Sequence, residues 1–450
     1  MKLTVCLPLF GLVFMSTTRL YATDFLSTYQ EAVQSNGTYL AAQESYKAAG
    51  YGVPIARAAL LPTLQLTANT AANRQSPAIS EVTANTQAVN YNTNQYQLQL
   101  TQPLLNISSW YSYSQAEATY KAAAVTYAQA EQTLIVSTAS AYFGVLEAED
   151  QLKYAQANQE SLQEQLTQTE AQYKVGLKAL TDVESTQASY ESAVAQTIAD
   201  QNALSNAYEN LAVITGKPEK DLSPLKQNFP LLNPEPANID DWVNFGLKNN
   251  LNLQAAMLES EISKLGIRIN QAGYAPTLSA QGTYLSTHSN ENIPVPSQRS
   301  TTKSGALNVA WTPFSGGSTY FSVKQSQYTY QENLANQEQT LRTTDTGVRQ
   351  AYLNVLSDIS QIQAFQQAVI SGQVSLRAMK AGYLVGTRTI VDVLTEQTNL
   401  FNSEQQYTQA IYNYINDSLS LKEQAGLLAP TDVTAINGWL AVYNVPGQNS

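Results

Sequence analysis

Two copies of one unit make up most of the sequence, and this duplication limits the possible folds more than any other feature. The segment Tyr173-Lys-Val-Gly-Leu-Lys-Ala-Leu-Thr-Asp-Val183 returns as Tyr383-Leu-Val-Gly-Thr-Arg-Thr-Ile-Val-Asp-Val393, an offset of 383 − 173 = 210 residues. Near the amino terminus the offset is 276 − 62 = 214, which relates Pro62 to Pro276. Repeated units adopt the same supersecondary structure, so one description serves both copies.

The repeats divide the chain into segments. We expect residues 23–216 and 238–426 to form two structural repeats, joined by an irregular, proline-rich connector at 217–237 and followed by a C-terminal segment at 427–450. Residues 1–22 are typical of a secretory signal, because Lys2 precedes an apolar run that is too short to span a bilayer. Ala22 is the expected last residue removed, and the mature protein is expected to be exported.

Each repeat is predicted to begin with a helical stretch and to continue into a β-hairpin. Pro62 and Pro276 should end the helical stretches, at 24–60 and 239–272. Apolar and polar residues then alternate, which is the pattern of a strand with one apolar face. The predicted strands lie at about 62–72, 94–102, 276–287 and 303–312, with polar loops at 73–92 and 288–302.

Each repeat is predicted to end in two long helices. Pro103 and Pro313 suit the first turn of a helix, where the missing N–H is tolerated, so the long helices should cover 104–172 and 314–382. The chain should turn at Gly176 and Gly386 and return in helices at 182–215 and 390–425. A helix of about 69 residues is roughly 100 Å long and needs packing partners along its length.

The composition excludes several classes of function. The 35 acidic and 24 basic residues give a formal net charge of −11, whereas phosphate recognition needs a basic surface, so we expect no nucleic-acid binding. The single histidine, His288, and the single cysteine, Cys6, leave no basis for a zinc site or for catalysis by these residues. We expect no catalytic site, no metal, no cofactor and no enzyme activity.

The four predicted strands cannot close a barrel by themselves. Alternating faces suit either a soluble sandwich or a membrane barrel, but an open sheet edge is not tolerated in lipid. If the strands cross a membrane, several copies must therefore contribute to one barrel. Two copies would supply eight strands and three would supply twelve, and the composition does not choose between them.

The sequence resembles the TolC outer-membrane efflux protein family over nearly all of residues 24–430. The resemblance rests on residues 383–394, on Thr138-Ala-Ser-Ala-Tyr-Phe143 and on the paired Val-Gly turns at 175–176 and 385–386, together with the repeat. It implies an α+β membrane protein with two tandem repeats, each a long helical hairpin plus a β-hairpin. The implied assembly is a homotrimer that forms a 12-stranded β-barrel in the outer membrane of a Gram-negative bacterium, continued by an α-helical tunnel through the periplasm.

The resemblance also implies a function and partners. A channel-tunnel of this family belongs to a tripartite efflux or type I secretion system and passively conducts drugs, toxic compounds or secreted proteins, which contributes to multidrug resistance. Its implied partners are a periplasmic adaptor (membrane fusion) protein, an inner-membrane pump of the RND, ABC or MFS type, and outer-membrane lipid. The implied adaptor-docking tips are Val175, Gly176, Leu177, Val385, Gly386 and Thr387.

Candidate gate residues follow from the same resemblance. The family's gate tyrosine falls on Tyr383 and its gate arginine on Arg388, and their first-repeat partners fall on Asp182 and Thr181. Polar contacts of these types are worth about 1–3 kcal/mol each. They would favour a closed entrance that a docked partner can still open.

The family's entrance aspartate falls on Asp392. The position of a second family aspartate is Thr395 here, but the next residue, Glu396, shares a helix face with Asp392 and is an alternative source of a second carboxylate. Carboxylates gathered around a narrow axis favour cations. Residues 389–392 also fit the Ser/Thr-x-x-acid capping box, so helix capping is a second interpretation of Asp392.

Two other protein classes share the long helices. A coiled-coil surface or adhesive protein without a channel would need a strong heptad seam. A periplasmic adaptor would show one helical hairpin flanked by soluble β domains. Strands and prolines at equivalent places in both repeats favour the channel over either alternative.

The gate assignment predicts the effect of a double substitution. Tyr383→Phe combined with Arg388→Ser should raise the single-channel conductance in a planar bilayer, because both polar contacts at the entrance are removed. An unchanged conductance would count against these roles.

Overall fold

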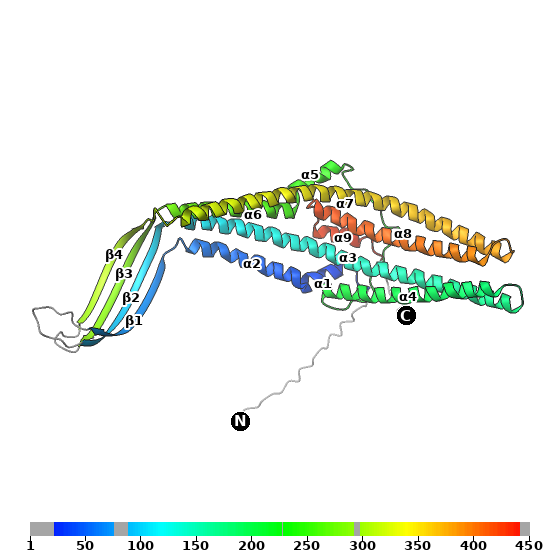
Figure 1. The fold of residues 1–450 in the computed structure, drawn as a ribbon, viewed down its shortest axis with the longest axis horizontal. Helices are drawn as coiled ribbons and strands as arrows, with labels where there is room; N and C mark the ends of the chain where they lie inside the picture. Colours follow the sequence, from blue (N-terminus) through cyan, green and yellow to red (C-terminus); the bar gives the residue numbers. More distant parts are fainter. Residues whose placement is uncertain (1–21, 76–88, 227, 292–297, 442–450) are drawn as a thin grey trace, which may run out of the picture.

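The computed structural model describes residues 22–75, 89–226, 228–291 and 298–441. The chain is elongated, with a four-stranded sheet at one end and the turns of two long helical hairpins at the other (Figure 1). The signal sequence predicted at 1–22 lies outside the described residues except for Ala22. So do the central parts of the two predicted polar loops, at 76–88 and 292–297.

The helical stretch at the start of each repeat is two helices. They are α1 (Phe25–Ser35) and α2 (Gly37–Ala58) in the first repeat, and α5 (Ile239–Asn249) and α6 (Leu251–Gln271) in the second. Both predicted stretches are therefore helical, but each contains a break that the sequence did not predict. Asn36 and Asn250 break the helices, because each leaves helical geometry and its side chain accepts the N–H three residues later, at 3.0 Å. The two breaks are equivalent in the repeats, since 250 − 36 = 214.

The sheet is antiparallel and contains β1 (Thr63–Gln75), β2 (Val89–Leu105), β3 (Thr277–Glu291) and β4 (Gln298–Ala310), in that order. Pro103 lies within β2, opposite Ser279 of β3, so its predicted place in the first turn of a helix is wrong. Two conditions allow a proline there. The paired part of β1 begins opposite Thr101, and the register of β2 with β3 shifts between Pro103 and Leu105.

The long helices are α3 (Ile107–Lys174), α4 (Leu180–Thr215), α7 (Ser318–Leu384) and α8 (Ile390–Gln424). Asn106 begins α3 by accepting the backbone N–H of Ser109 at 3.1 Å. Pro313 also lies outside its predicted helix, because the left-handed residues Gly316 and Gly317 delay the start of α7. We call α3 with α4 the first hairpin and α7 with α8 the second hairpin.

The main hydrophobic core lies at the waist of the molecule, where the connector crosses the long helices (Figure 1). Phe25 of α1 packs on Tyr142 and Phe143 of α3, with ring centroids 5.6 and 5.5 Å apart. The buried Tyr142 hydroxyl donates to the carbonyl of Ser223 in the connector at 2.9 Å. The waist therefore ties the start of the chain, the connector and α3 into one packed unit.

The C-terminal segment completes the waist with a short helix, α9 (Pro430–Asn437), which the sequence did not predict. Asn437 accepts the N–H of Leu26 at 3.1 Å and donates to Asp24 at 2.9 Å. Lys422 of α8 pairs with Asp432 of α9 at 2.6 Å. Both ends of the described chain are thus fixed to the same region.

An acidic pair, one member buried and the other half-buried, lies between the helices of the second hairpin. Asp358 of α7 is 7% exposed and faces Asp417 of α8. Burial and the neighbouring carboxylate raise the pKa of Asp358 to about 7, and burial also raises the pKa of Asp417. Near neutral pH one proton is therefore shared between the two side chains.

This pair predicts a pH-dependent stability. Between the ordinary aspartate pKa and about 7, the folded chain binds a proton that the unfolded chain releases, so stability falls as the pH rises through this window. Asp358→Asn should raise the thermal midpoint at pH 8, because it removes a buried charge whose desolvation costs several kcal/mol. It should also flatten the dependence between pH 5 and 8, measured by circular dichroism in detergent. Glu338→Gln, on the exposed face of the same helix, is the control and should change neither.

Candidate functional site

The predicted gate, entrance and docking residues all lie at one end of the molecule, farthest from the sheet (Figure 1). The first tip, residues 175–179, joins α3 to α4. The second tip, residues 385–389, joins α7 to α8. The structure therefore brings together residues that are about 210 positions apart in the sequence.

Both tips have the same backbone geometry. Gly176 and Gly386 are left-handed, with φ of 75° and 79°. In the first tip Gly176 N–H donates to Tyr173 and Leu177 N–H to Gln172, both at 2.9 Å. The equivalent bonds of the second tip run from Gly386 to Tyr383 at 3.2 Å and from Thr387 to Gly382 at 2.9 Å. This is the Schellman motif in both repeats, and it satisfies the last carbonyls of α3 and α7.

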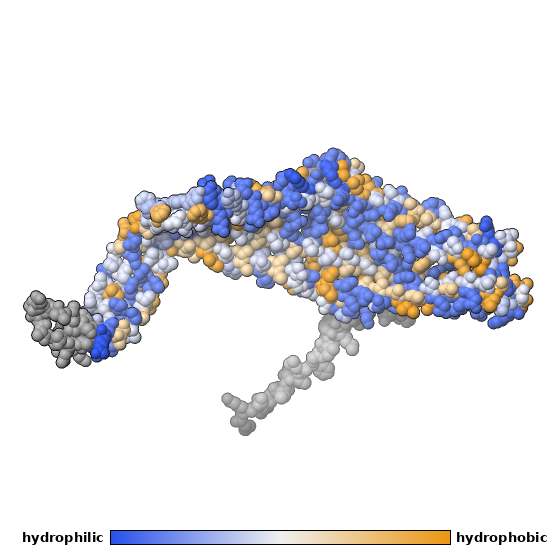
Figure 2. Space-filling model, in the orientation of Figure 1, coloured by the Kyte–Doolittle hydropathy of each residue, from blue (hydrophilic) through white to orange (hydrophobic). Residues whose placement is uncertain are grey.

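The tips expose apolar side chains. Val175, Leu177 and Val385 are 71%, 73% and 75% exposed, and hydrophobic residues are visible at this end of the molecule in Figure 2. Exposed apolar side chains at adjacent turns favour contact with another protein.

Tyr383 connects the two hairpins near the tips. Its side chain is only 4% exposed and belongs to a small apolar cluster with Ile390 and Val393. Its hydroxyl donates weakly to Gln172 of α3, at 3.5 Å. The ammonium of Lys178, in the first tip, lies 3.8 Å from the centre of the Tyr383 ring. The contact of Lys178 with the ring face of Tyr383 is thus close, whereas the contact of Gln172 with the hydroxyl is weak.

The other predicted gate residues are not joined in the single protomer. Within the described part of the chain, no hydrogen bond links Tyr383 to Asp182 or Arg388 to Thr181. Asp182 lies in the first turn of α4, where its carbonyl accepts the hydroxyl of Thr186 at 2.7 Å. Arg388 and Thr181 are exposed. These pairings remain predictions for an assembled channel.

Asp392 caps α8. The Thr389 N–H and hydroxyl both donate to Asp392 Oδ2, at 2.8 and 2.9 Å, and Asp392 N–H donates to the Thr389 hydroxyl at 3.2 Å. The structure therefore contains the capping box of the second interpretation. These hydrogen bonds, with a smaller contribution from Arg388, lower the pKa of Asp392, so the carboxylate keeps its charge at mildly acidic pH.

Asp392 shares one face of α8 with Thr395 and Glu396. The opposite face packs on the rest of the hairpins through Val393, Leu394 and Gln397. Because positions three and four apart lie on the same side of a helix, the three polar residues form a stripe in which Thr395 is exposed and Asp392 and Glu396 are half-buried. The carboxylate of Glu396 is thus placed one turn from that of Asp392.

A polar network further up the hairpins was not predicted. Lys380 of α7 donates to Ser161 of α3 at 3.1 Å, and Gln397 of α8 donates to Asn158 of α3 at 2.9 Å. Lys178 was also missed, although the repeat alignment already placed it opposite Arg388, since 388 − 178 = 210. No local pattern marks the network, because its members come from three different helices.

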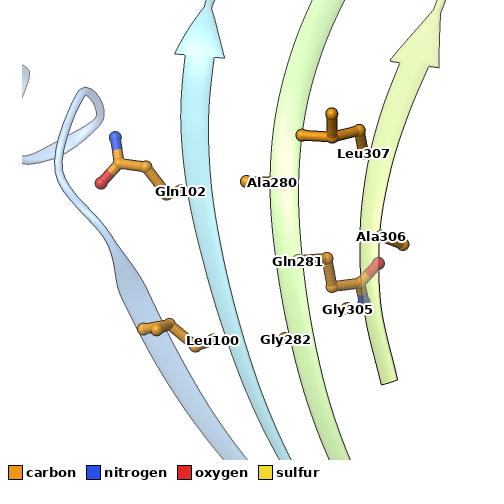
Figure 3. Close-up of a pocket in the computed structure, with 8 residues that line it drawn as sticks. All are labelled: Leu100, Gln102, Ala280, Gln281, Gly282, Gly305, Ala306 and Leu307. Atoms are coloured by element: carbon orange, nitrogen blue, oxygen red, sulfur yellow. The ribbon is translucent and has the colours of Figure 1, made fainter.

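The sheet carries a shallow hollow on its apolar face (Figure 3). Gly282 and Gly305 are direct partners across β3 and β4 and leave the floor without side chains, while Leu100 and Leu307 stand on either side. The eight lining residues carry no charge, which favours an apolar contact over an ion site. Among the described residues, no helix is long and apolar enough to cross a membrane. None of the described His, Cys, Asp or Glu side chains gather into a possible metal site.

Comparisons with known proteins agree with this arrangement. The family model described as outer membrane efflux protein matches residues 28–217 and 242–427. The outer membrane protein TolC of Escherichia coli is 35% identical over 431 residues, covering 93% of this chain and 85% of the relative. The alkaline protease secretion protein AprF of Pseudomonas aeruginosa is 26% identical over 428 residues, covering 92% and 87%. The structure of the outer membrane protein VceC of Vibrio cholerae has the same fold, with a TM-score of 0.75 at 18% identity, covering 89% of this chain and 96% of that one.

The left-handed geometry of the second tip predicts that replacing Gly386 by a residue with a side chain destabilises the turn. A Cβ there would meet no heavy atom within 4 Å, so the effect of Gly386→Ala comes from the left-handed backbone alone. We expect the turn to lose about 1 kcal/mol, which speeds hydrogen exchange of the Thr387 amide roughly five-fold. Gly386→Asn should have a smaller effect, because asparagine tolerates this conformation. Equal exchange in all three proteins would show that the turn is not strained.

Proposed function

Because the chain belongs to the outer membrane efflux protein family, we propose that it acts as a homotrimer, with one barrel in the outer membrane and one helical tunnel in the periplasm. It is an outer-membrane efflux or type I secretion channel, and the channel is favoured over a coiled-coil surface protein. The observation that carries the trimer proposal is the four-stranded sheet with two open edges. Three such sheets joined edge to edge supply twelve strands, the number that the family resemblance implies.

The two faces of the sheet support a barrel wall. Leu66, Leu98 and Tyr284 lie next to one another on one face and are exposed in the protomer. On the other face, Gln97 donates to Gln99 at 2.8 Å and Gln99 donates to Thr101 at 3.3 Å. We assign the apolar face to lipid and the polar face to a water-filled lumen.

The helical part supports the tunnel and its docking end. Val175, Leu177 and Val385 are exposed at the tips. The tips lie at the end farthest from the sheet, which would point towards the inner membrane (Figure 1). We assign these exposed side chains to a periplasmic adaptor, which connects the channel to an inner-membrane pump. The drugs, toxic compounds or secreted proteins delivered by that pump would pass through the tunnel passively.

The second hairpin supplies the entrance. Three copies of the stripe that contains Asp392 would gather around the threefold axis and concentrate negative potential there. Tyr383 and Arg388, with Asp182 and Thr181 as their proposed partners, would favour the closed position of this hairpin. Opening would follow when the docked adaptor and pump replace these contacts.

The proposal predicts cation-sensitive channels. The purified protein in a planar bilayer should show small, stable conductance steps that a trivalent cation added to the tip side blocks. Asp392→Ala should abolish the block, because it removes the carboxylate nearest the entrance. Thr395→Ala changes the same helix face without changing charge and should leave the block intact. Glu396→Gln should weaken the block only if the second carboxylate takes part.

Two outcomes would change the proposal. If the trivalent cation still blocks the Asp392→Ala channels, the constriction would lie in another part of the tunnel. A correctly folded trimer without any channel activity would contradict the export function itself.

A further inference from the structure

The two tips repeat a spacing that involves a tyrosine and a cation. Tyr173, Gly176 and Lys178 of the first tip correspond to Tyr383, Gly386 and Arg388 of the second. In each tip the tyrosine lies three residues before the left-handed glycine and the cation lies two residues after it. Because the two turns have matching hydrogen bonds, the same side chains project from equivalent backbone positions.

One tyrosine and one cation of this set meet across the two hairpins. The Lys178 ammonium of the first hairpin lies 3.8 Å from the ring centre of Tyr383 in the second. The other described lysine–tyrosine contacts, Lys303 with Tyr284 and Lys324 with Tyr320, are 5.9 and 6.0 Å. Within the described residues, Lys178 forms no ion pair with a carboxylate, so the ring is its close partner.

The equivalent tyrosine and cation, Tyr173 and Arg388, are exposed in the single protomer. Tyr173 is 43% exposed, whereas Tyr383 is 4% exposed. Arg388 is likewise exposed, whereas Lys178 is half-buried. The first hairpin therefore reaches the second, whereas no aromatic ring of the described residues lies against Arg388.

We propose that the hairpins form a closed ring in which the tip cation of each hairpin packs on the tip tyrosine of the next. Lys178 packs on Tyr383 within one protomer, and Arg388 packs on Tyr173 of the partner subunit. This inference rests on the homotrimer proposed above. A ring closes when every unit repeats the same head-to-tail contact, and six hairpins in three protomers give three contacts of each kind. Arginine stacks on an aromatic ring at least as well as lysine.

The proposal adds a contact through the tyrosine ring to the polar contacts of the gate. The hydroxyl of Tyr383 makes only the weak 3.5 Å bond to Gln172, while its ring is covered by Lys178. Tyr383→Phe alone, which keeps the ring, should thus open the entrance less than Tyr383→Leu. Most of the opening by the double change of Tyr383→Phe with Arg388→Ser would then come from Arg388.

Cross-linking tests the geometry without relying on channel activity. In a Cys6→Ser background, Tyr173→Cys with Arg388→Cys treated with a short bismaleimide should give species of two and three chains on a denaturing gel. Lys178→Cys with Tyr383→Cys should remain a single-chain species, with the link shown by mass spectrometry of its peptides. If the first pair gives no multi-chain species in a protein that is otherwise trimeric, the contact between subunits is overturned.

Conductance tests whether the contacts hold the entrance. Lys178→Met, Arg388→Met, Tyr383→Leu and Tyr173→Leu each remove a charge or a ring and should raise the time spent at high conductance about two- to thirty-fold. The matched variants Lys178→Arg and Tyr173→Phe keep the cation or the ring and should behave as the unchanged protein. Tyr383→Phe and Arg388→Lys keep the ring or the cation but alter a proposed polar contact of the gate, so they should open the entrance less than Tyr383→Leu and Arg388→Met. Equal thermal midpoints in all eight would exclude general destabilisation as the cause.

The failures of the two proposals are distinguishable. If the unchanged protein forms channels but Tyr383→Phe opens them as strongly as Tyr383→Leu, the hydroxyl carries the contact and the inference is wrong. If Lys178→Met has no effect on those channels, it is also wrong. If the unchanged protein forms no channels, the export function fails, while the cross-links still decide whether the tips meet as proposed.

Discussion

Backbone hydrogen bonding at the edges of the sheet is the constraint on which the rest of the structure depends. β1 and β4 each pair with one neighbour in the described chain, so each has an outer row of N–H and C=O groups without a strand beside it. Such groups cannot remain unpaired in lipid. Placing this sheet in a membrane therefore requires further copies, and a ring of sheets brings the hairpins below it into a ring as well. In the proposed trimer, contacts between tips of different protomers would then follow from the pairing of strands at the opposite end of the molecule.

The distribution of apolar contacts separates a waist with a large core from a tip end with a small one. The waist contains the large cluster around Phe25, Tyr142 and Ile415, which includes residues of the connector and of both hairpins. Near the tips the apolar cluster is much smaller, and polar contacts such as Gln397 with Asn158 supplement it. Regions with few buried apolar contacts open at lower free energy than the core. The fold thus concentrates its stability at the waist, where the connector and the two hairpins meet. The hairpin ends are packed by fewer apolar contacts.

The sequence predicts the parts of this fold that local patterns encode. The repeat, the alternating strands, the long helices and the glycines of both tips follow from local spacing. The sequence shows this spacing twice, once in each repeat. The breaks at Asn36 and Asn250 were missed because one capping residue leaves the surrounding helical pattern unchanged. Pro103 was misplaced because a shift in strand register, which depends on β3, decides whether a proline fits. The contact of Lys178 with Tyr383 joins residues 383 − 178 = 205 positions apart, and no local spacing contains it.

The two interpretations of Asp392 are compatible because they use different parts of the side chain. Both hydrogen bonds from Thr389 go to Oδ2, and Oδ1 makes no hydrogen bond with the described residues. Capping fixes the carboxylate at the start of α8 and lowers its pKa, so that the group stays charged. A negative charge that is held in place and only half-buried is what the proposed entrance, lined by three copies, would need. The capping box therefore supplies the orientation that cation recognition at the axis would use.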